Sequence, residues 1–254
     1  MPSKNQPPPR STLTSIGART RSPYGFEMTE SCLDCRHRDE YLFCNLPGIA
    51  LEMLDQIRST AVYPKGAMLF VEGQDSRGIF ILCHGRVKLM TSSEQGKTVI
   101  LRIADGGEVL GLSATISERP YEVTAETLEP CEANFISRKD FLNFLKQQGE
   151  AAVNVARELS NHYHCAYRDV RSLGLSRSAQ AKIARLVLDW ADSSPDPNTC
   201  HLRLTHEEIS QLIGTSRETV TRVLSDLKKR KLLQIRGARC VLQNRQALET
   251  LAGS

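Results

Sequence analysis

The feature that most constrains this chain is the stretch from Leu204 to Leu233, which predicts two short helices joined by a glycine turn. Thr205 is followed three residues later by Glu208, and this spacing predicts a capping box that begins a helix. Gly214 is expected to end that helix, because glycine adopts the left-handed cap conformation without a Cβ clash. The apolar face of the helix consists of Ile209, Leu212 and Ile213.

A second helix is expected to follow at once. Thr215 and Glu218 repeat the capping-box spacing. Apolar residues then recur at helical spacing, at Val220, Val223, Leu224 and Leu227. The opposite face carries polar side chains near its N-terminal end, namely Arg217, Glu218, Thr221 and Arg222. Two helices of this kind form a helix-turn-helix, whose second helix can enter the major groove of DNA.

This polar face has the chemistry of base readout, because arginine can bond guanine in a bidentate way and glutamate can accept from cytosine N4. An ordinary helical hairpin with a solvated charged face would show the same helix spacing. The paired caps and the basic run 228–231 favour DNA binding. The expected DNA contacts are Thr205, Thr215, Ser216, Arg217, Glu218, Thr221, Arg222, Lys228 and Lys229.

A hairpin is predicted directly after these helices, over residues 232–242, with its turn at Gly237 and Ala238. A helix-turn-helix followed by a two-stranded wing is a winged helix. Arg236 and Arg239 flank the expected wing tip and complete the set of expected DNA contacts. A further helix is expected ahead of the pair, over residues 179–190.

Charge is distributed as a DNA-binding protein requires. The net charge is only +4, but residues 176–254 hold 13 Lys and Arg against 8 Asp and Glu. No apolar run approaches the roughly 20 residues of a membrane span, and the basic N-terminus lacks the apolar segment of a secretory signal, so we expect a cytoplasmic protein without membrane contact. We find no Walker loop, nucleophile elbow or His-Glu-x-x-His motif, and therefore expect no enzyme.

The region 61–136 has a different character, with short β-rich runs separated by glycine-containing turns. Many short strands at this pitch predict a sandwich or roll of antiparallel strands. The runs cover residues 67–71, 78–82, 85–89, 99–103 and 131–136. Residues 1–30 are rich in proline, serine and threonine and are expected to form an unstructured tail.

A long helix is predicted after the strands, with apolar residues that alternate at spacings of four and three. This seam suits a two-stranded coiled coil, although an amphipathic helix that lies on its own domain would also explain it. The seam consists of Ala152, Ala156, Leu159, Tyr163, Ala166, Val170 and Leu173. Four segments result: a tail (1–30), a sensory roll (31–148), a dimerisation helix (149–174) and a winged helix (175–254).

Together these segments resemble the Crp/Fnr family of transcription regulators. Its recognition helix is similar to residues 213–222, and residues 78–82, 85–89 and 107–112 are similar to its roll. The resemblance implies an α+β fold: a cyclic-nucleotide-binding-like antiparallel β-roll, a dimerisation helix and a C-terminal winged helix-turn-helix. It also implies a homodimer on an inverted repeat, with Arg217, Glu218 and Arg222 as base readers. The cyclic-AMP branch has arginine at the position of Arg217, which implies TGTGA-like half-sites.

The first candidate effector site is a group of cysteines. Cys32, Cys35 and Cys44 are close in sequence, and such a group in a cytosolic protein indicates metal or redox chemistry. Cys131 matches the position where the oxygen-sensing branch supplies a fourth ligand, and four thiolates suit a [4Fe–4S] cluster. The gap between Cys35 and Cys44 is longer than that branch uses. Structural zinc, or a simple core role for Cys131, are the alternatives.

The second candidate effector is a cyclic nucleotide. Gly107 and Glu108 resemble the ribose-binding turn of the cyclic-AMP branch, and Arg119 lies near its phosphate-binding position. Pro120 stands where a small hydroxyl residue is expected, which weakens this alternative because proline has no N–H to offer a phosphate. In either case we expect the effector to shift the helices over 150–173 and so the two recognition helices. RNA polymerase is a candidate further partner, which the sequence leaves open.

Overall fold

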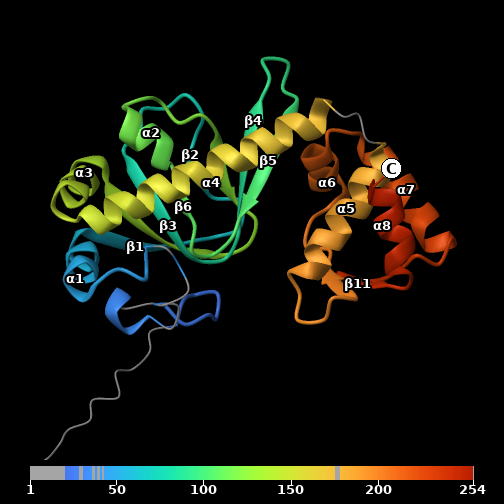
Figure 1. Cartoon of the computed structure of the whole chain (residues 1–254), viewed down its shortest axis with the longest axis horizontal. Coiled ribbons are helices and arrows are strands. Elements are labelled where there is room, and N and C mark those ends of the chain that lie inside the picture. Colours follow the sequence, from blue (N-terminus) through green and yellow to red (C-terminus); the bar gives the residue numbers. More distant parts are fainter. Residues whose placement is uncertain are drawn as a thin grey trace, which may run out of the picture.

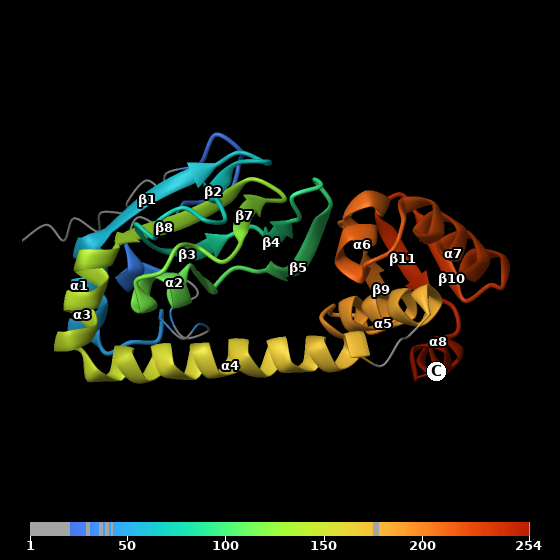
Figure 2. The same cartoon turned by 90° about the horizontal axis from the view of Figure 1, so that it is seen from above.

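The computed structural model describes residues 21–28, 31–35, 38, 41, 43–174 and 178–253, with backbone only for 168–174. Its N-terminal half is a roll of two four-stranded antiparallel sheets (Figures 1 and 2). One sheet has the order β1 (Arg58–Tyr63), β8 (Cys131–Ser137), β3 (Gly78–His84) and β6 (Val109–Leu110). The other has the order β2 (Met68–Phe70), β7 (Thr124–Thr127), β4 (Val87–Ser92) and β5 (Thr98–Ala104).

The first sheet has two buried faces, because successive side chains of a strand point to opposite sides. On β3, Phe80 and Leu82 point into the roll, and Ile79 and Ile81 point the other way. The outer face is covered by α1 (Gly48–Ile57) and α3 (Arg138–Gln147), and α2 (Leu112–Ser117) follows β6. The short helix η1 (Cys32–Asp34) packs against α1 on the same outer side.

The predicted antiparallel roll is therefore confirmed, and each of the five predicted runs overlaps a strand. Three strands were not predicted, since β1 mixes polar and apolar residues, β6 has only two residues, and β7 (Thr124–Thr127) contains a single apolar residue. The expectation of an unstructured tail is corrected for residues 21–28, which form a turn closed by a bridge between Arg21 and Glu27. Residues 1–20 and 29–30 lie outside the described part of the chain.

The long helix α4 (Gly149–Gly174) runs along the roll toward the C-terminal domain (Figure 2). Ala151 and Val155 are buried in the core of α1 and α3, and Leu159 packs against that core. Tyr163 and Ala166 of the predicted seam are exposed, whereas Leu159 is partly covered by its own domain. The predicted helix is confirmed, but its apolar residues serve two different faces. The side chains of Val170 and Leu173 lie outside the described part.

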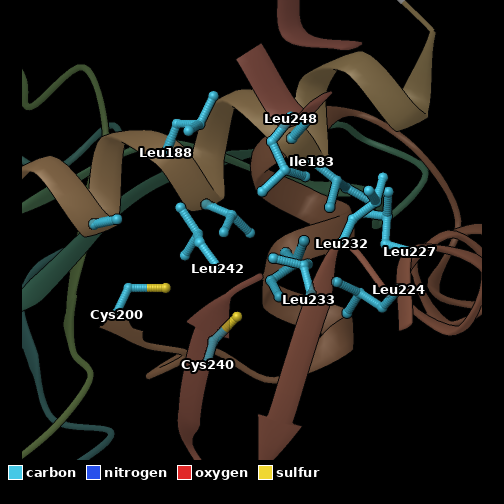
Figure 3. Packing of buried hydrophobic residues seen from close by; sticks show 14 of the residues in the cluster. Ile183, Leu188, Cys200, Leu224, Leu227, Leu232, Leu233, Cys240, Leu242 and Leu248 are labelled. Atoms are coloured by element: carbon cyan, nitrogen blue, oxygen red, sulfur yellow. The ribbon is translucent and has the colours of Figure 1, made fainter. Parts of the chain in front are cut away.

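The C-terminal domain is built around one apolar core (Figure 3). Its elements are α5 (Ala179–Asp192), β9 (Thr199–His201), α6 (His206–Ile213), α7 (Arg217–Lys229), β10 (Leu233–Arg236), β11 (Arg239–Leu242) and α8 (Arg245–Gly253). The predicted helix-turn-helix and wing are present, and β9 and α8 were not predicted. Cys200 of β9 and Cys240 of β11 are cross-strand partners in this core. None of the described helices combines the length and apolar character needed to cross a membrane.

The turn between α6 and α7 gives a stability prediction. Gly214 has φ 69° and no atoms that would obstruct a Cβ, so Gly214→Ala tests the backbone conformation alone. We expect a loss of about 1–2 kcal/mol in the free energy of unfolding, because an L-residue is strained in the left-handed region. Denaturant unfolding of the full chain measures it. Gly253→Ala, also unobstructed but in a helix, is the control and should not destabilise; equal effects would contradict the explanation.

Candidate nucleic-acid interface and sensory site

The first helix of the pair is held at both ends. The backbone N–H of Thr205 donates to the Glu208 carboxylate at 2.8 Å, and the N–H of Glu208 donates to the Thr205 hydroxyl at 3.2 Å. The predicted capping box is therefore confirmed. At the other end Gly214 is left-handed, and the Lys182 ammonium of α5 donates to the Ile213 carbonyl at 3.0 Å. A cation at this helix end also favours the helix dipole.

The second capping box, predicted from Thr215 and Glu218, is wrong by one residue. The N–H of Thr215 donates to the Ser210 carbonyl at 3.0 Å, so Thr215 still belongs to the turn. Ser216 has an extended backbone and its hydroxyl accepts from the N–H of Thr219 at 3.2 Å. The helix α7 thus begins at Arg217 with Ser216 as its N-cap, because serine satisfies the orphan N–H groups of a first turn as well as threonine does.

The expected base-reading residues of α7 lie on one solvent-exposed face. Arg217, Glu218 and Arg222 are all exposed, and α7 lies on the side of its domain that points away from the roll (Figure 2). The pKa of the Glu218 carboxyl is lowered, first by its own backbone N–H and then by the Ser216 hydroxyl. Glu218 is therefore an ionised acceptor at neutral pH. The face offers two guanidinium donors and one carboxylate acceptor within two helical turns.

Thr221 has a supporting role that the sequence did not reveal. Its hydroxyl donates to the Arg217 carbonyl at 3.0 Å and lies 2.8 Å from Nδ1 of His206, the first residue of α6. This contact ties the start of α6 to the exposed face of α7. Because the two residues are fifteen positions apart on different helices, no local spacing rule could have paired them.

The wing and the end of α7 supply further positive charge. β10 and β11 pair through Arg236 and Arg239, so Gly237 and Ala238 form the two-residue turn that was predicted. Both arginines are exposed at the tip, as expected of groups that contact phosphate. Lys228 and Lys229 are exposed in the last turn of α7, as predicted.

The cysteines separate into two environments. Cys32 is buried in η1, where its N–H donates to the Asp55 carboxylate at 2.8 Å. The amide nitrogen of Asn134 lies 4.0 Å from the Cys32 sulfur and donates to the Cys83 sulfur at 3.1 Å. Burial raises the pKa of the Cys83 thiol well above its ordinary value. The charges that raise this pKa further come from Glu132, Cys32, Cys44 and Cys35.

Cys131, the predicted fourth ligand, is not brought together with the other three. It lies in the core inside the roll, where its thiol contacts the carbonyls of Glu129 and Arg86 at 3.1 and 3.4 Å. Burial raises its pKa to about 11, and no cysteine is among the groups that act on it. The predicted set of four ligands therefore does not fit a single metal centre. Sequence position alone could not show on which side of the sheet Cys131 would point.

The candidate nucleotide-binding residues do not form a common site. Glu108 is already paired with other residues, and Arg119 is not one of its partners. The Glu108 carboxylate accepts from the N–H of Asp105 at 2.8 Å and forms an ion pair with Arg102. The ring of Tyr41 lies so close to Gly107 that a Cβ there would meet it at 2.0 Å. Arg119 is exposed and is not among the partners of Glu108.

Arg102 extends this arrangement to the long helix. Its guanidinium lies 3.3 Å from Nε2 of His162 on α4, and the same nitrogen lies 3.3 Å from the Glu158 carboxylate. The hydrogen bond from His162 is the main cause that lowers the pKa of Glu158, followed by the charges of His162 and Arg102 against burial. Glu108, Glu158 and His162 are the only group of three candidate metal ligands in close proximity among the described residues. Arg102 already supplies the positive charge, so we interpret the group as an ion-pair network.

Comparisons with known proteins agree with this two-domain arrangement. The family model described as "Cyclic nucleotide-binding domain" matches residues 60–148, and the "Crp-like helix-turn-helix domain" matches residues 181–251. The first match covers most of the roll, and the second spans α6, α7 and the wing.

The chain is 27% identical to the "cAMP-activated global transcriptional regulator CRP" of Salmonella typhimurium, across 71% of this chain and 87% of that protein. It is 24% identical to the "Anaerobic regulatory protein" of Bacillus subtilis, across 72% and 79% respectively. The solved structure of FixK2 from Bradyrhizobium japonicum has a TM-score of 0.70 at 21% identity, and the match covers 78% of this chain and 98% of that one. That structural likeness shows the fold.

The network on α4 predicts a pH-dependent contribution to stability. Because the folded pKa of Glu158 lies below its ordinary value, its stabilisation is present above that value, about 4.5, and is lost as pH falls through the folded pKa. We expect Glu158→Gln to cost about 1 kcal/mol or less at pH 7, as partly exposed ion pairs do, and progressively less as pH falls below the ordinary pKa of the carboxyl toward 3. Denaturant unfolding across this pH range measures it. A constant difference would contradict an ionic role. Glu150→Gln, at the start of the same helix, is the control.

Proposed function

The chain belongs to the Crp/Fnr family of DNA-binding transcription regulators, and we propose that it binds an inverted-repeat operator as a homodimer under the control of an effector sensed by the roll. The observation that carries this proposal is the exposed face of α7, with Arg217, Glu218 and Arg222 opposite a buried apolar face. The relatives are transcription regulators rather than enzymes. This agrees with the expectation from the sequence that the chain is not an enzyme.

We assign base-sequence specificity to the start of α7. The wing and the lysines at the end of α7 are assigned the sequence-independent affinity for DNA. Arginine side chains in the first turns of a recognition helix can reach guanine O6 and N7, which favours half-sites of the TGTGA type. Two such half-sites would lie on one side of the duplex, with centres about 34 Å apart. Arg236, Arg239, Lys228 and Lys229 would bind phosphates, a contribution that is independent of sequence and sensitive to salt.

This division gives a paired prediction for DNA binding. Replacing Arg222 by Ala should cost about 1–3 kcal/mol on the preferred operator and relax the preference at one base pair, because a bidentate contact is lost. Replacing Lys229 by Ala should weaken binding to all sequences alike and lower the salt dependence. Selection from random DNA followed by titration at several salt concentrations separates the two effects. Selected sequences without an inverted repeat would refute the proposed readout.

A homodimer would be formed through the exposed face of α4. Val153, Tyr163 and Tyr167 are 49%, 68% and 65% exposed, although they are large apolar or aromatic side chains. Together with Ala156 and Ser160, which are also exposed, they recur at spacings of three and four along the helix. A stripe of this spacing is suited to pack against a second helix. It lies on the side of α4 away from Ala151 and Val155, which pack on the roll.

Oligomeric state tests this interface directly. Tyr163→Glu places a charge in the proposed seam and should weaken dimerisation by about tenfold or more, since burying an unpaired charge costs more than 1.4 kcal/mol. Sedimentation equilibrium gives the monomer–dimer constant. Met68→Glu is the matched control, because Met68 is a similarly exposed apolar residue on β2, and this variant should remain dimeric. If both variants dimerise equally well, dimerisation does not use this stripe.

The roll is proposed to control the recognition helices through its contacts with the C-terminal domain and with α4. The C-terminal domain includes Leu128 of the roll in its core, and α6 packs against β5. The ion-pair network of Arg102 joins the same strand to α4. An effector that alters the roll would thereby shift both α4 and α6. The regulator would act in the cytoplasm, where its target DNA is. The cyclic-nucleotide alternative keeps the support of the matched domain, but Glu108 is already paired.

A further inference from the structure

We propose that Cys83, rather than Cys131, completes a four-thiol site with Cys32, Cys35 and Cys44, and that this site binds a soft metal centre. The inference rests on the proposed function, because it assigns the effector site of the sensory roll. The chemistry is that of a thiolate-bound centre, which is supplied either by a zinc ion or by an iron–sulfur cluster.

The alternation of the sheet decides which cysteine is available. Along β8, Cys131 and Ala133 point into the roll, whereas Ile136 points to the outer face that α1 and α3 cover. Along β3, Leu82 points into the roll. Cys83, one residue later, points to the outer face, where its sulfur meets Asn134. The sheet therefore separates Cys131 from the side on which η1 and its cysteine lie.

The contacts of Asn134 place two of the four sulfurs together. Its amide nitrogen is within 4.0 Å of both the Cys32 and the Cys83 sulfur. Its carbonyl oxygen accepts from the Thr60 hydroxyl at 2.7 Å and from Arg58 at 3.0 Å, which fixes the orientation of the amide. One side chain thus holds the N-terminal segment and β3 against each other at their sulfur atoms.

Charges of both signs surround these two sulfurs. Burial raises the pKa of Cys32 to about 12, and the positive charge of Arg58, whose side chain is only 7% exposed, acts in the opposite direction. The negative groups that face the site are Asp55, which Arg58 already neutralises at 2.6 Å, and Glu132. A metal that binds here displaces the thiol protons, because thiolate ligation requires deprotonated sulfur.

The sulfur of Cys131 is tightly enclosed. A Cβ on Gly85 would lie 2.6 Å from its sulfur, and two backbone carbonyls enclose the sulfur on other sides. This packing is that of a core residue. A glycine at this position of the β3–β4 turn leaves just enough room for the thiol, and a metal with its other ligands would not fit there.

For a zinc ion, the remaining ligands must approach on binding. Among the described residues no three cysteine sulfurs lie within 4.8 Å of one another, whereas a zinc thiolate bond is about 2.3 Å long. Cys35 follows η1 and Cys44 lies in a turn before α1, so neither is held in a helix or a strand ladder. Cys32 and Cys83 provide the fixed half of the site, and Cys35 and Cys44 close it.

Metal analysis of the full chain, purified without oxygen, tests the inference. Iron, acid-labile sulfide and visible charge-transfer absorbance identify a cluster, and zinc alone identifies a zinc site. We expect Cys83→Ala and Cys32→Ala to lower the bound metal at least about tenfold, whereas the matched control Cys131→Ala retains it. A wild-type chain without stoichiometric zinc or iron, or a Cys131→Ala chain that loses metal while Cys83→Ala keeps it, overturns the proposal.

A second measurement on the wild-type chain covers the case in which a variant does not fold. Alkylation followed by mass spectrometry should label Cys32, Cys35, Cys44 and Cys83 much faster after chelation, and Cys131 at the same rate before and after. Unchanged labelling of Cys83 overturns the proposal. Operator binding of the wild-type chain is measured in parallel. A wild-type chain that holds metal but does not bind the operator contradicts the proposed function only, and a wild-type chain that binds the operator but holds no metal contradicts the site only.

Discussion

In both halves of this molecule, the burial of one face of a helix or strand determines which side chains its other face presents. In α7 the burial of Val220, Leu224 and Leu227 fixes the rotation of the helix about its axis. Arg217 and Arg222 are then exposed because no rotation could bury them without exposing that apolar stripe, at a cost of about 1.5–3 kcal/mol for each leucine. The DNA-binding face is therefore a consequence of core packing, and Gly214 and the two caps only set where the helix begins.

The same constraint acts with a period of two in the sheet. Phe80 and Leu82 fill the inside of the roll, so Cys83 is directed outward, and Ala133 places Cys131 inward with it. Two cysteines whose strands are neighbours thus lie on opposite faces of the sheet. A match in sequence position to a known ligand does not establish the same role, because the remaining ligands must lie on the same face of the sheet.

Local signals made the two helices and the wing of the helix-turn-helix predictable, whereas long-range contacts were not predictable. Capping residues, a left-handed glycine and a two-residue hairpin each act over a few positions, so Thr205 and Gly214 could be assigned from spacing. The Thr215 assignment failed because Ser216 competes for the same cap. The contact of His206 with Thr221, and that of Asn134 with Cys83, join different elements and follow only from the tertiary fold. The seam of α4 was likewise divided by the roll that packs against it.

Continuity of packing connects the cysteine face to the helix proposed to form the dimer. Cys32 belongs to the same core cluster as Ala151 and Val155 of α4, so a movement of η1 alters the support of that helix directly. Farther along α4, His162 contacts both Glu158 and Arg102 of β5, the strand against which α6 packs. A ligand that drew η1 toward β3 would therefore act on α4 and α6 through residues already in contact. Among the described residues, the core around Cys131 includes none from α4 and reaches that helix only indirectly, through Ala104 of β5.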